Sequence, residues 1–268
     1  MSERTALITG ASGGVGLELT RLLAADRYNV VMVGRNRERL DRIATELRTH
    51  AQIVVRPEAC DLSEPRAAFD LWNALTKAGI SVDVLVNNAG VGAYGALEEQ
   101  DAADLDRMLQ LNTAALTTLT RLVLPGMRQR HWGRILNVAS VVAYQPGAPR
   151  MATYYATKAY VLSFSRGLAR ELRGTGVSVT VLSPGPTETA FDDRAGANVD
   201  VPYKRVSKMT AAAVAKAGYD GMQRHSREVV PGLVTKVLAL AGEFTPRTIG
   251  LEVNRIIWQP RAVRRPRQ

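Results

Sequence analysis

Short apolar runs alternate with longer amphipathic segments along most of the chain. Apolar residues three and four positions apart indicate helices, and short runs rich in β-branched residues indicate strands. The predicted strands are Thr5–Thr9, Asn29–Val33, Gln52–Val55, Val82–Val86, Arg134–Val138, Val177–Leu182 and Glu228–Val230. The predicted helices are Val15–Ala25, Arg37–Arg48, one that begins at Ser63, Asn112–Arg130, Thr153–Arg173, Thr210–Met222 and two near the C-terminus.

Strand–helix–strand alternation predicts parallel strands joined by right-handed crossovers. We therefore predict an α/β fold, a single-domain Rossmann-like doubly wound parallel sheet with helices on both faces, spanning residues 1–268. In the last helix we expect Thr245 as N-cap and Pro246 as the first helical residue. Its apolar face should pack on its own domain, with a dimer contact or membrane docking as alternatives, and comprises Ile249, Val253, Ile256 and Ile257.

Composition is ordinary for a globular protein, with 46% hydrophobic residues in 268. Cys60 is the one cysteine, which excludes an intrachain disulfide and suits a reducing compartment. The N-terminus lacks a signal-peptide pattern, and no apolar run approaches the about 20 residues of a membrane span. We expect a cytoplasmic protein.

The charge is strongly basic, +10 from 35 basic and 25 acidic residues. Residues 255–268 hold five arginines and no acid. We expect this tail to be a solvated, disordered chain end. Peripheral membrane contact through it is the alternative, and we expect no nucleic-acid partner.

The stretch TGASGGVG, Thr9–Gly16, matches two chemical patterns. As G-x-S-x-G it would present Ser12 as the nucleophile of a serine hydrolase. As a glycine-rich turn between strand and helix it would hold a pyrophosphate, because Gly10, Gly14 and Gly16 let backbone N–H groups approach phosphate at the positive helix end. None of the three histidines (His50, His131, His225) has a recognisable triad setting, so we favour the nucleotide interpretation.

The end of the second predicted strand bears on which nucleotide binds. An acid about 20 residues after the glycine turn usually binds the ribose 2′-hydroxyl of NAD, whereas an arginine suits a 2′-phosphate. Here Gly34 is followed by Arg35, Asn36 and Arg37, and the first acid is Glu38. We predict NADP(H) as cofactor, with NAD(H) less favoured.

Tyr154 and Lys158 form a third pattern. They are four residues apart on a predicted helix and so share a face. A phenol is a poor acid near neutral pH, with a pKa of about 10. A neighbouring ammonium favours the phenolate and lowers that value, which suits Tyr154 for proton transfer.

These patterns together resemble the short-chain dehydrogenase/reductase family, in its compact single-domain branch. The resemblance runs from about Thr5 to Thr189 and more loosely to Gly232. Four motifs occur in order at fitting spacing: T-G-x-x-x-G-x-G at residues 9–16, N-N-A-G at 87–90, Y-x-x-x-K at 154–158 and P-G at 184–185.

The resemblance implies catalytic roles for four residues. Tyr154 is the expected general acid/base, and Lys158 lowers its pKa and holds the nicotinamide ribose hydroxyls. Ser140, 14 residues before Tyr154, is expected to hydrogen-bond the substrate oxygen, as an oxyanion donor does. Asn112 resembles the family's helix asparagine that positions a proton-relay water.

The resemblance also implies cofactor contacts. Arg35 and Asn36 would meet the 2′-phosphate, Asp61 and Leu62 the adenine, and Pro184, Gly185, Thr187 and Thr189 the carboxamide. The remaining predicted cofactor residues lie in the glycine turn, beside the adenosine ribose and in the catalytic pair: Gly10, Ser12, Gly14, Val15, Gly16, Asn88, Ala89, Gly90, Tyr154 and Lys158. One departure is Gly13, where many NADP-preferring relatives carry a basic residue, so Arg35 must act with little help beyond Asn36 or Arg39.

We therefore predict an NADP(H)-dependent oxidoreductase that interconverts a small-molecule carbonyl and its alcohol, with no metal. Residues 190–225 would cover the substrate. Family resemblance implies a homodimer or homotetramer. The alternatives are a non-catalytic NADP-sensing regulatory protein, a sugar-nucleotide epimerase or dehydratase, and the serine hydrolase at Ser12.

Overall fold

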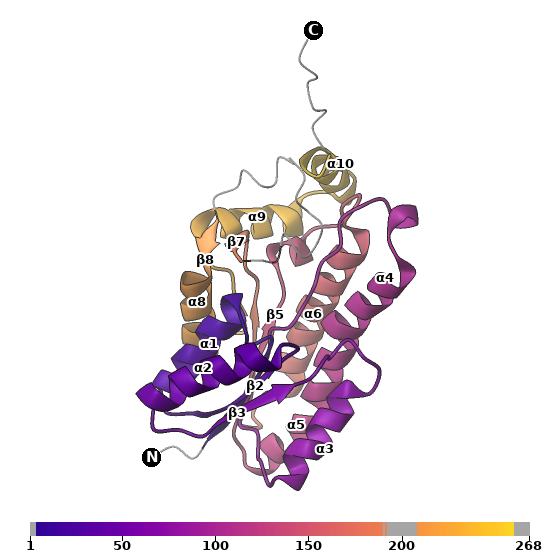
Figure 1. The fold of residues 1–268 in the computed structure, drawn as a ribbon. Helices are drawn as coiled ribbons and strands as arrows, with labels where there is room; N and C mark the ends of the chain where they lie inside the picture. Colours follow the sequence, from indigo (N-terminus) through magenta and orange to yellow (C-terminus); the bar gives the residue numbers. More distant parts are fainter. Residues whose placement is uncertain (1–3, 190, 192–207, 260–268) are drawn as a thin grey trace.

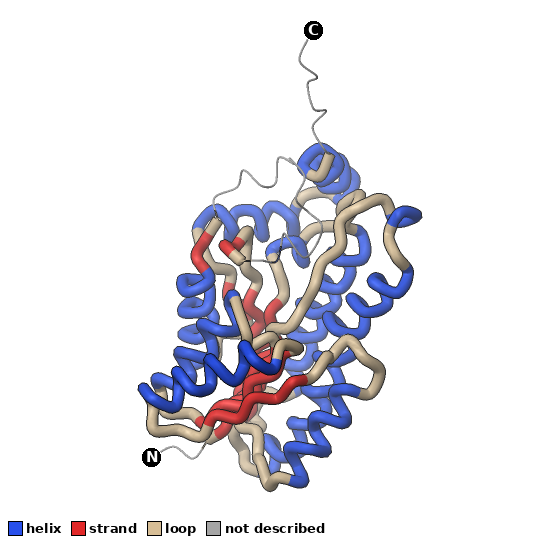
Figure 2. The backbone as a smooth tube through the Cα atoms, in the orientation of Figure 1, coloured by secondary structure: helices blue, strands red, loops and turns tan. Residues whose placement is uncertain are grey.

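Within residues 4–189, 191 and 208–259, which this computed structural model describes, a seven-stranded parallel sheet forms the centre of the protein (Figures 1 and 2). The strand order is β3-β2-β1-β4-β5-β6-β9. The strands are β1 (Thr5–Thr9), β2 (Asn29–Gly34), β3 (Val55–Ala59), β4 (Val84–Asn87), β5 (Gly133–Val138), β6 (Val177–Leu182) and β9 (Glu228–Val229). A separate short pair joins β7 (Thr187–Glu188) to β8 (Met209–Thr210).

Helices cover both faces of the sheet (Figure 1). On one face lie α1 (Gly14–Ala25), α2 (Arg37–His50) and α8 (Ala211–Gln223), which bury Leu19, Leu40 and Val214 in one core cluster. On the other lie α3 (Ala67–Lys77), α5 (Leu116–Gln129) and α6 (Ala152–Glu171), which bury Leu71, Leu119 and Leu168. The predicted doubly wound fold is confirmed.

Further elements surround the carboxyl ends of the strands. They are the 3₁₀ turns η1 (Leu97–Glu99) and η3 (Val141–Tyr144), the helix α4 (Ala102–Leu109), the π-helical segment η2 (Gln110–Ala115), and the C-terminal helices α9 (Leu233–Phe244) and α10 (Arg247–Ile257). The sheet order reverses between β1 and β4. In open α/β sheets, ligands bind outside the carboxyl ends of strands at such a reversal.

The predicted strand Gln52–Val55 is wrong in its position, because β3 begins where that prediction ends. β3 is an edge strand with a burial pattern that is mostly intermediate, and it contains Pro57. An edge strand tolerates proline and charged residues since one side has no ladder partner. The prediction followed the apolar run before β3 and therefore placed the strand too early in the sequence.

Two predicted helix starts are also wrong. Ser63 does not begin a helix; its hydroxyl and N–H both donate to Asp61. Arg66 adopts φ 67°, in the left-handed region, and α3 starts at the next residue. The helix predicted from Asn112 begins instead at Ala102, where the Asp101 side chain accepts the Ala103 N–H at 2.7 Å and caps it.

The last helix begins at Arg247, with Pro246 rather than Thr245 at the N-cap position. Its predicted apolar face does not pack on its own domain; three of the four residues are exposed, and Ile257 is half-buried. α10 is attached by other groups. Gly250 approaches Pro146 so closely that a Cβ would lie 2.9 Å from its ring, and Asn254 donates to the Gly147 carbonyl at 2.7 Å.

Much of the segment expected to cover substrate has another place in the fold. Residues 211–223 form α8, which packs on α1, and the Tyr219 hydroxyl donates to Asp26. Residues 190 and 192–207 of that segment, and residues 260–268 of the basic tail, lie outside the described residues. Within the described part of the chain, no helix is both long and apolar enough to cross a membrane.

Candidate active site

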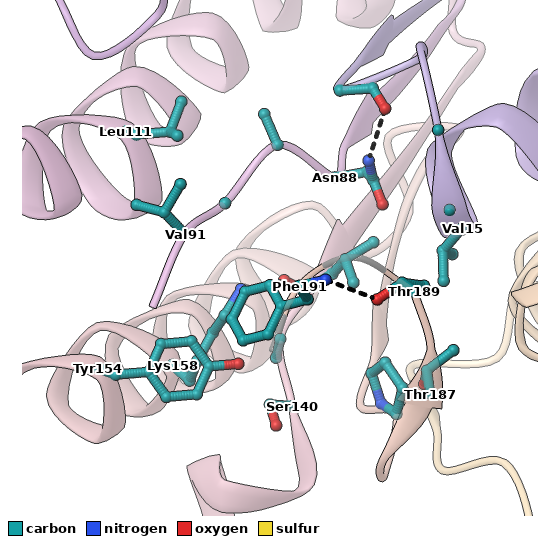
Figure 3. A pocket seen from close by; sticks show the side chains of 18 of the residues that line it. Val15, Asn88, Val91, Leu111, Ser140, Tyr154, Lys158, Thr187, Thr189 and Phe191 are labelled. Carbon is teal, nitrogen blue, oxygen red and sulfur yellow. Dashed lines mark hydrogen bonds between the residues drawn. The ribbon is translucent and has the colours of Figure 1, made fainter. Parts of the chain in front are cut away.

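A cavity of about 630 Å³ lies at the carboxyl ends of the strands (Figure 3). Most of the predicted site residues line it. They are Gly10, Ser12, Gly14, Val15, Arg35, Asp61, Leu62, Asn88, Ala89, Gly90, Ser140, Tyr154, Lys158, Pro184, Gly185, Thr187 and Thr189. The predicted residues outside its wall are Gly16, Asn36 and Asn112. Segments more than 170 residues apart in sequence thus meet around one space.

The glycine turn between β1 and α1 fits a phosphate group. Gly10 and Gly14 have φ +66° and +54°, where a side chain is strained. A Cβ on Gly10 would also lie 2.7 Å from Asn88 Nδ2. Gly13 is the N-cap of α1 and supplies no side-chain cap, so the first N–H groups of the helix have no side-chain acceptor there. Those N–H groups and the helix dipole favour an anion at this place.

Asn88 fixes the turn to the end of β4. Its Nδ2 donates to the Thr9 carbonyl at 2.9 Å and to the Gly10 carbonyl at 3.3 Å, the bond drawn in Figure 3. The Thr9 hydroxyl accepts the Asn88 and Ala89 N–H groups. The N-N-A-G segment therefore holds the glycine turn in shape from the neighbouring strand. This geometry explains why both motifs belong to one site.

The part of the cavity near the glycine turn carries two arginines, Arg35 and Arg39. Arg35 lies 3.8 Å from the Asp61 carboxylate. Burial disfavours ionisation of Asp61, but hydrogen bonds from Ser63 and the charge of Arg35 outweigh it and hold the pKa below its usual value. The Arg39 guanidinium lies 3.3 Å from where a Cβ on Gly13 would stand. A neighbouring helix thus supplies positive charge beside Gly13.

Asn36 has a different place from the one predicted. Its side chain accepts the Arg39 N–H at 2.8 Å and caps α2. That bond uses its carbonyl oxygen and turns the residue toward the helix. Asn36 therefore orients the helix that carries Arg39.

Three predicted catalytic residues meet at the inner end of the cavity (Figure 3). Tyr154 and Lys158 come from α6, and Ser140 from the end of β5, and all three are largely buried. Ser140 Oγ also accepts the Val142 N–H at 3.4 Å, which orients it at the start of η3. The Phe191 ring lies 5.5 Å from the ring of Tyr154, centroid to centroid.

Lys158 is a buried cation with an unusual environment. Its Nζ donates to the Val138 carbonyl at 3.0 Å and lies 5.9 Å from the centroid of the Tyr154 ring. Burial lowers the pKa of its ammonium to about 8. Its positive charge lies at one end of the cavity, close to the tyrosine.

Asn112 lies in the π-helical segment η2, buried behind the cavity. Its Oδ1 accepts the Val91 N–H at 3.0 Å, and its Nδ2 donates to the Val91 carbonyl and to the Thr157 hydroxyl. The side chain therefore links the loop after β4 to α6. π-turns often occur at functional sites because they displace the backbone ladder.

The serine hydrolase interpretation lacks its base. Among the described residues, no histidine lines the cavity that holds Ser12. His50, for example, bonds the Glu46 carbonyl at the far end of α2. Ser12 stands in the turn beside Gly34, a position that suits a phosphate or a turn hydrogen bond.

A sequence model of the short chain dehydrogenase family matches residues 4–200. The chain belongs to this family. The matched region includes the glycine turn, Ser140 and the Tyr154–Lys158 pair, so the residues that carried the resemblance lie inside the match.

Similar proteins agree with this assignment. A probable NADP-dependent dehydrogenase of Haemophilus influenzae is 38% identical over 188 residues, 69% of this chain and 72% of that protein. A short-chain dehydrogenase from Sphingobium yanoikuyae, solved in complex with NADPH, has a TM-score of 0.80 and 34% identity over 89% of this chain and 92% of its own. The bulky-bulky ketone specific alcohol dehydrogenase from Comamonas testosteroni has a TM-score of 0.75 and 32% identity, over 87% and 88%.

This short-chain dehydrogenase also has cavity residues that sequence reasoning missed. They are mostly apolar and include Val91, Leu111, Val142, Met151 and Trp258. Val142 and Met151 lie close in sequence to Ser140 and Tyr154, and that proximity was a usable signal. Trp258 follows the last helix, about a hundred residues from the catalytic pair, and no local pattern points to it.

Proposed function

We propose that this short-chain dehydrogenase is an NADP(H)-dependent oxidoreductase that interconverts a carbonyl and an alcohol, with Tyr154 as general acid/base. The observation that carries the proposal is one cavity in which a phosphate-binding turn and three buried groups, Ser140, Tyr154 and Lys158, occur together. Perturbed ionisable groups in such a cavity are typical of active sites.

NADPH, when bound, supplies the hydride. The Ser140 hydroxyl donates a hydrogen bond to the substrate oxygen, where negative charge develops during reduction. The Tyr154 hydroxyl gives its proton to that oxygen, and in the reverse direction the phenolate takes it back. The Lys158 ammonium favours the phenolate electrostatically, because opposite charges in a buried site attract strongly.

NADP(H) is the cofactor, in preference to NAD(H). Arg35 and Arg39 both line the cavity near the glycine turn, and the stretch that would hold an NAD-selecting acid begins with Arg35. Relatives point the same way, since one is a probable NADP-dependent dehydrogenase and another was solved with NADPH.

The substrate is a bulky, largely apolar carbonyl compound. The walls near Tyr154 are formed by Val142, Met151, Phe191 and Trp258, whose side chains offer apolar surface. Apolar walls with few polar groups bind apolar ligands and use the polar groups for orientation. The Comamonas neighbour, an alcohol dehydrogenase specific for bulky-bulky ketones, supports this class.

We further propose that the enzyme acts in the cytoplasm and assembles as a homodimer or homotetramer. Each chain is one catalytic domain. The other catalytic and cofactor contacts follow the assignments made above, with Asn112 positioning a relay water from η2.

The test is Tyr154→Phe, assayed by NADPH absorbance with a panel of bulky ketones. We expect turnover to fall at least about hundredfold, because the proton donor is gone. NADP⁺ should still raise the melting temperature of the variant, since a ligand that binds only the folded state stabilises it. The matched control is Tyr160→Phe, which removes an exposed hydroxyl from the same helix.

Two outcomes would overturn the proposal. Full turnover by Tyr154→Phe would remove the acid/base role from this residue. Cofactor binding by the wild-type protein with no turnover on any carbonyl or alcohol would favour the NADP-sensing regulator instead.

A further inference from the structure

The outer surface of α9 is apolar along its whole length. Leu233, Val237, Leu240 and Phe244 are 78%, 58%, 56% and 79% exposed. They are spaced i, i+4, i+7 and i+11, so they form one stripe along the helix. The buried residues Thr235 and Ala239 lie on the opposite side. The stripe therefore points directly into solvent.

The next helix continues this surface. Ile249, Val253 and Ile256 on α10 are 55%, 46% and 57% exposed, at i, i+4 and i+7. We call these three residues and the four of the α9 stripe the C-terminal apolar face. Elsewhere in the described chain, large exposed apolar side chains are scattered over separate elements, as single ones normally are. A concentration on two consecutive helices marks an interaction surface.

The helices are held with this face outward. A Cβ on Gly242 would lie 2.8 Å from the Tyr144 carbonyl oxygen, and one on Gly185 would lie 2.6 Å from the Thr235 hydroxyl. On α10, Asn254 bonds the Gly147 carbonyl. Small and polar residues thus make close inner contacts, and Leu238 and Ile257 pack on the core cluster beside them. The seven residues of the C-terminal apolar face are left outside.

The charged residues of α9, α10 and the sequence after them indicate what binds the C-terminal apolar face. Lys236, Arg247 and Arg255 lie on the same two helices. Of the two acids there, Glu252 pairs with Arg255, and Glu243 pairs with Arg166 of α6. The sequence then continues through residues 260–268 with four arginines and no acid. Apolar residues with Lys and Arg beside them are typical of helices that lie in a membrane interface, and anionic lipid attracts such clusters.

A second copy of the chain fits less well. A two-fold dimer apposes the same patch on both subunits. The C-terminal part of the sequence, residues 233–268, holds seven basic and two acidic residues, and like charges on two copies of it oppose association. An anionic bilayer covers the same apolar area and neutralises the charge.

We propose that the C-terminal apolar face docks the protein on the surface of an anionic phospholipid membrane. α9 and α10 lie at the end of the molecule where the strands have their carboxyl ends (Figure 1). Trp258, at the end of α10, lines the cavity. Docking therefore holds the apolar end of the cavity beside the lipid, where an apolar carbonyl compound concentrates. The docking itself does not depend on the proposed reaction.

The experiment is co-sedimentation of the full-length protein with vesicles of phosphatidylcholine, with and without phosphatidylglycerol, in the absence of cofactor and substrate. We expect binding to the anionic vesicles that weakens as salt rises. The triple variant Val237→Ser, Leu240→Ser, Phe244→Ser should reduce the partition coefficient about tenfold or more, because buried apolar area drives insertion.

The matched control is Val54→Ser, Phe69→Ser, Leu97→Ser, which changes three apolar residues exposed elsewhere and should bind vesicles like the wild type. An NADP⁺ thermal shift and turnover of a water-soluble ketone should be unchanged in both triple variants. Those two readouts separate a failure of docking from a failure of the proposed reaction.

Three results would overturn the inference. One is no binding of the wild type to anionic vesicles at low salt. Another is equal loss of vesicle binding in the two triple variants. The third is a wild-type dimer, seen by light scattering, that the Val237/Leu240/Phe244 variant converts to a monomer while vesicles have no effect; this would make a second copy the occupant.

Discussion

Lys158 shows how one residue can be costly to the fold and useful to the site. Its ammonium is buried, with the Val138 carbonyl as a hydrogen-bond acceptor. Removing a cation from water without a paired carboxylate disfavours the charged form. The lowered pKa of about 8 expresses that penalty. The same buried charge lies 5.9 Å from the centroid of the Tyr154 ring, where the proposed function uses it to favour the phenolate.

The penalty gives a pH signature in the stability of the protein. Below pH 8, Lys158 is charged in both states, and the folded state carries the full desolvation cost. Between its folded pKa of about 8 and the ordinary 10.5, the unfolded chain binds a proton that the folded protein has released. Stability contributed by this group therefore rises with pH across that window.

Lys158→Met removes this titration while keeping much of the volume. Relative to the variant, we expect the wild type to gain about 2 to 3 kcal/mol in free energy of unfolding between pH 7 and about pH 10, from the size of the pKa shift. Urea unfolding of both proteins across this range measures it, and other groups cancel in the difference. A constant difference would mean that Lys158 keeps an ordinary pKa.

Arg39 shows how a basic residue that is missing from a sequence motif can be supplied by another part of the fold. Gly13 leaves the turn without the basic residue of many NADP-preferring relatives, yet the Arg39 guanidinium lies next to it. Asn36 caps the helix that brings it there. The positive charge near the glycine turn thus comes from Arg35 and Arg39, on the strand end and on the first turn of α2.

Arg35→Ser and Arg39→Ser test this arrangement. Each should raise the KM for NADPH about tenfold, since a charge-assisted bond to phosphate is lost at a partly solvated site, and leave the KM for NADH nearly unchanged. Arg37→Ser is the matched control, because Arg37 is paired with Asp41 outside the cavity wall. Equal effects on both cofactors would contradict a 2′-phosphate contact.

At the scale of elements, the sequence predicted best where local pattern and burial agree. β1 and β6 match their predicted bounds because both are inner strands rich in apolar and β-branched residues, TALIT and VSVTVL. β3 was misplaced because an edge strand does not need that composition. α3 starts late because Arg66 takes a left-handed conformation, which arginine adopts rarely and no sequence pattern signals.

The candidate site was predictable for a related reason. Its glycines follow a predicted strand, and Tyr154 and Lys158 share one helix face, which the sequence pattern shows. Ser140 was assigned through the family resemblance, and it lines the same cavity. The cofactor contact of Asn36 stays a prediction, and its side-chain oxygen caps α2, a role that the prediction did not include. The exposure of α10 was also missed, since amphipathic spacing says which residues share a face but not what covers it.

At the scale of the whole molecule, the two halves of the chain make different ends of one cavity. The N-terminal half contributes the phosphate turn and the arginines, while Trp258 comes from beyond the last helix. The Trp258 ring N–H donates to the Tyr155 hydroxyl at 2.7 Å, and its carbonyl accepts from the Tyr94 hydroxyl at 3.0 Å. Such a long-range contact depends on the complete fold.

Trp258→Phe tests whether Trp258 affects only the end of the cavity where the substrate would bind. The smaller ring loses the hydrogen bond to Tyr155 and leaves space beside the rings of Tyr94 and Tyr155. We expect about 1 to 2 kcal/mol lower stability from the lost hydrogen bond, and a KM for bulky ketones raised about tenfold from lost apolar contact. The KM for NADPH should not change, because the arginines and the glycine turn lie at the other end.

Trp72→Phe provides the control for loss of an indole, since Trp72 packs in the cluster of α3 and α5 and does not line the cavity. It should lower stability without changing either KM. If Trp258→Phe raised the KM for NADPH as much as that for the ketone, Trp258 would support the whole cavity rather than its substrate end. A higher KM for the ketone with an unchanged KM for NADPH would instead show that the C-terminal helices, which carry the C-terminal apolar face, help to determine the size of substrate that the cavity accepts.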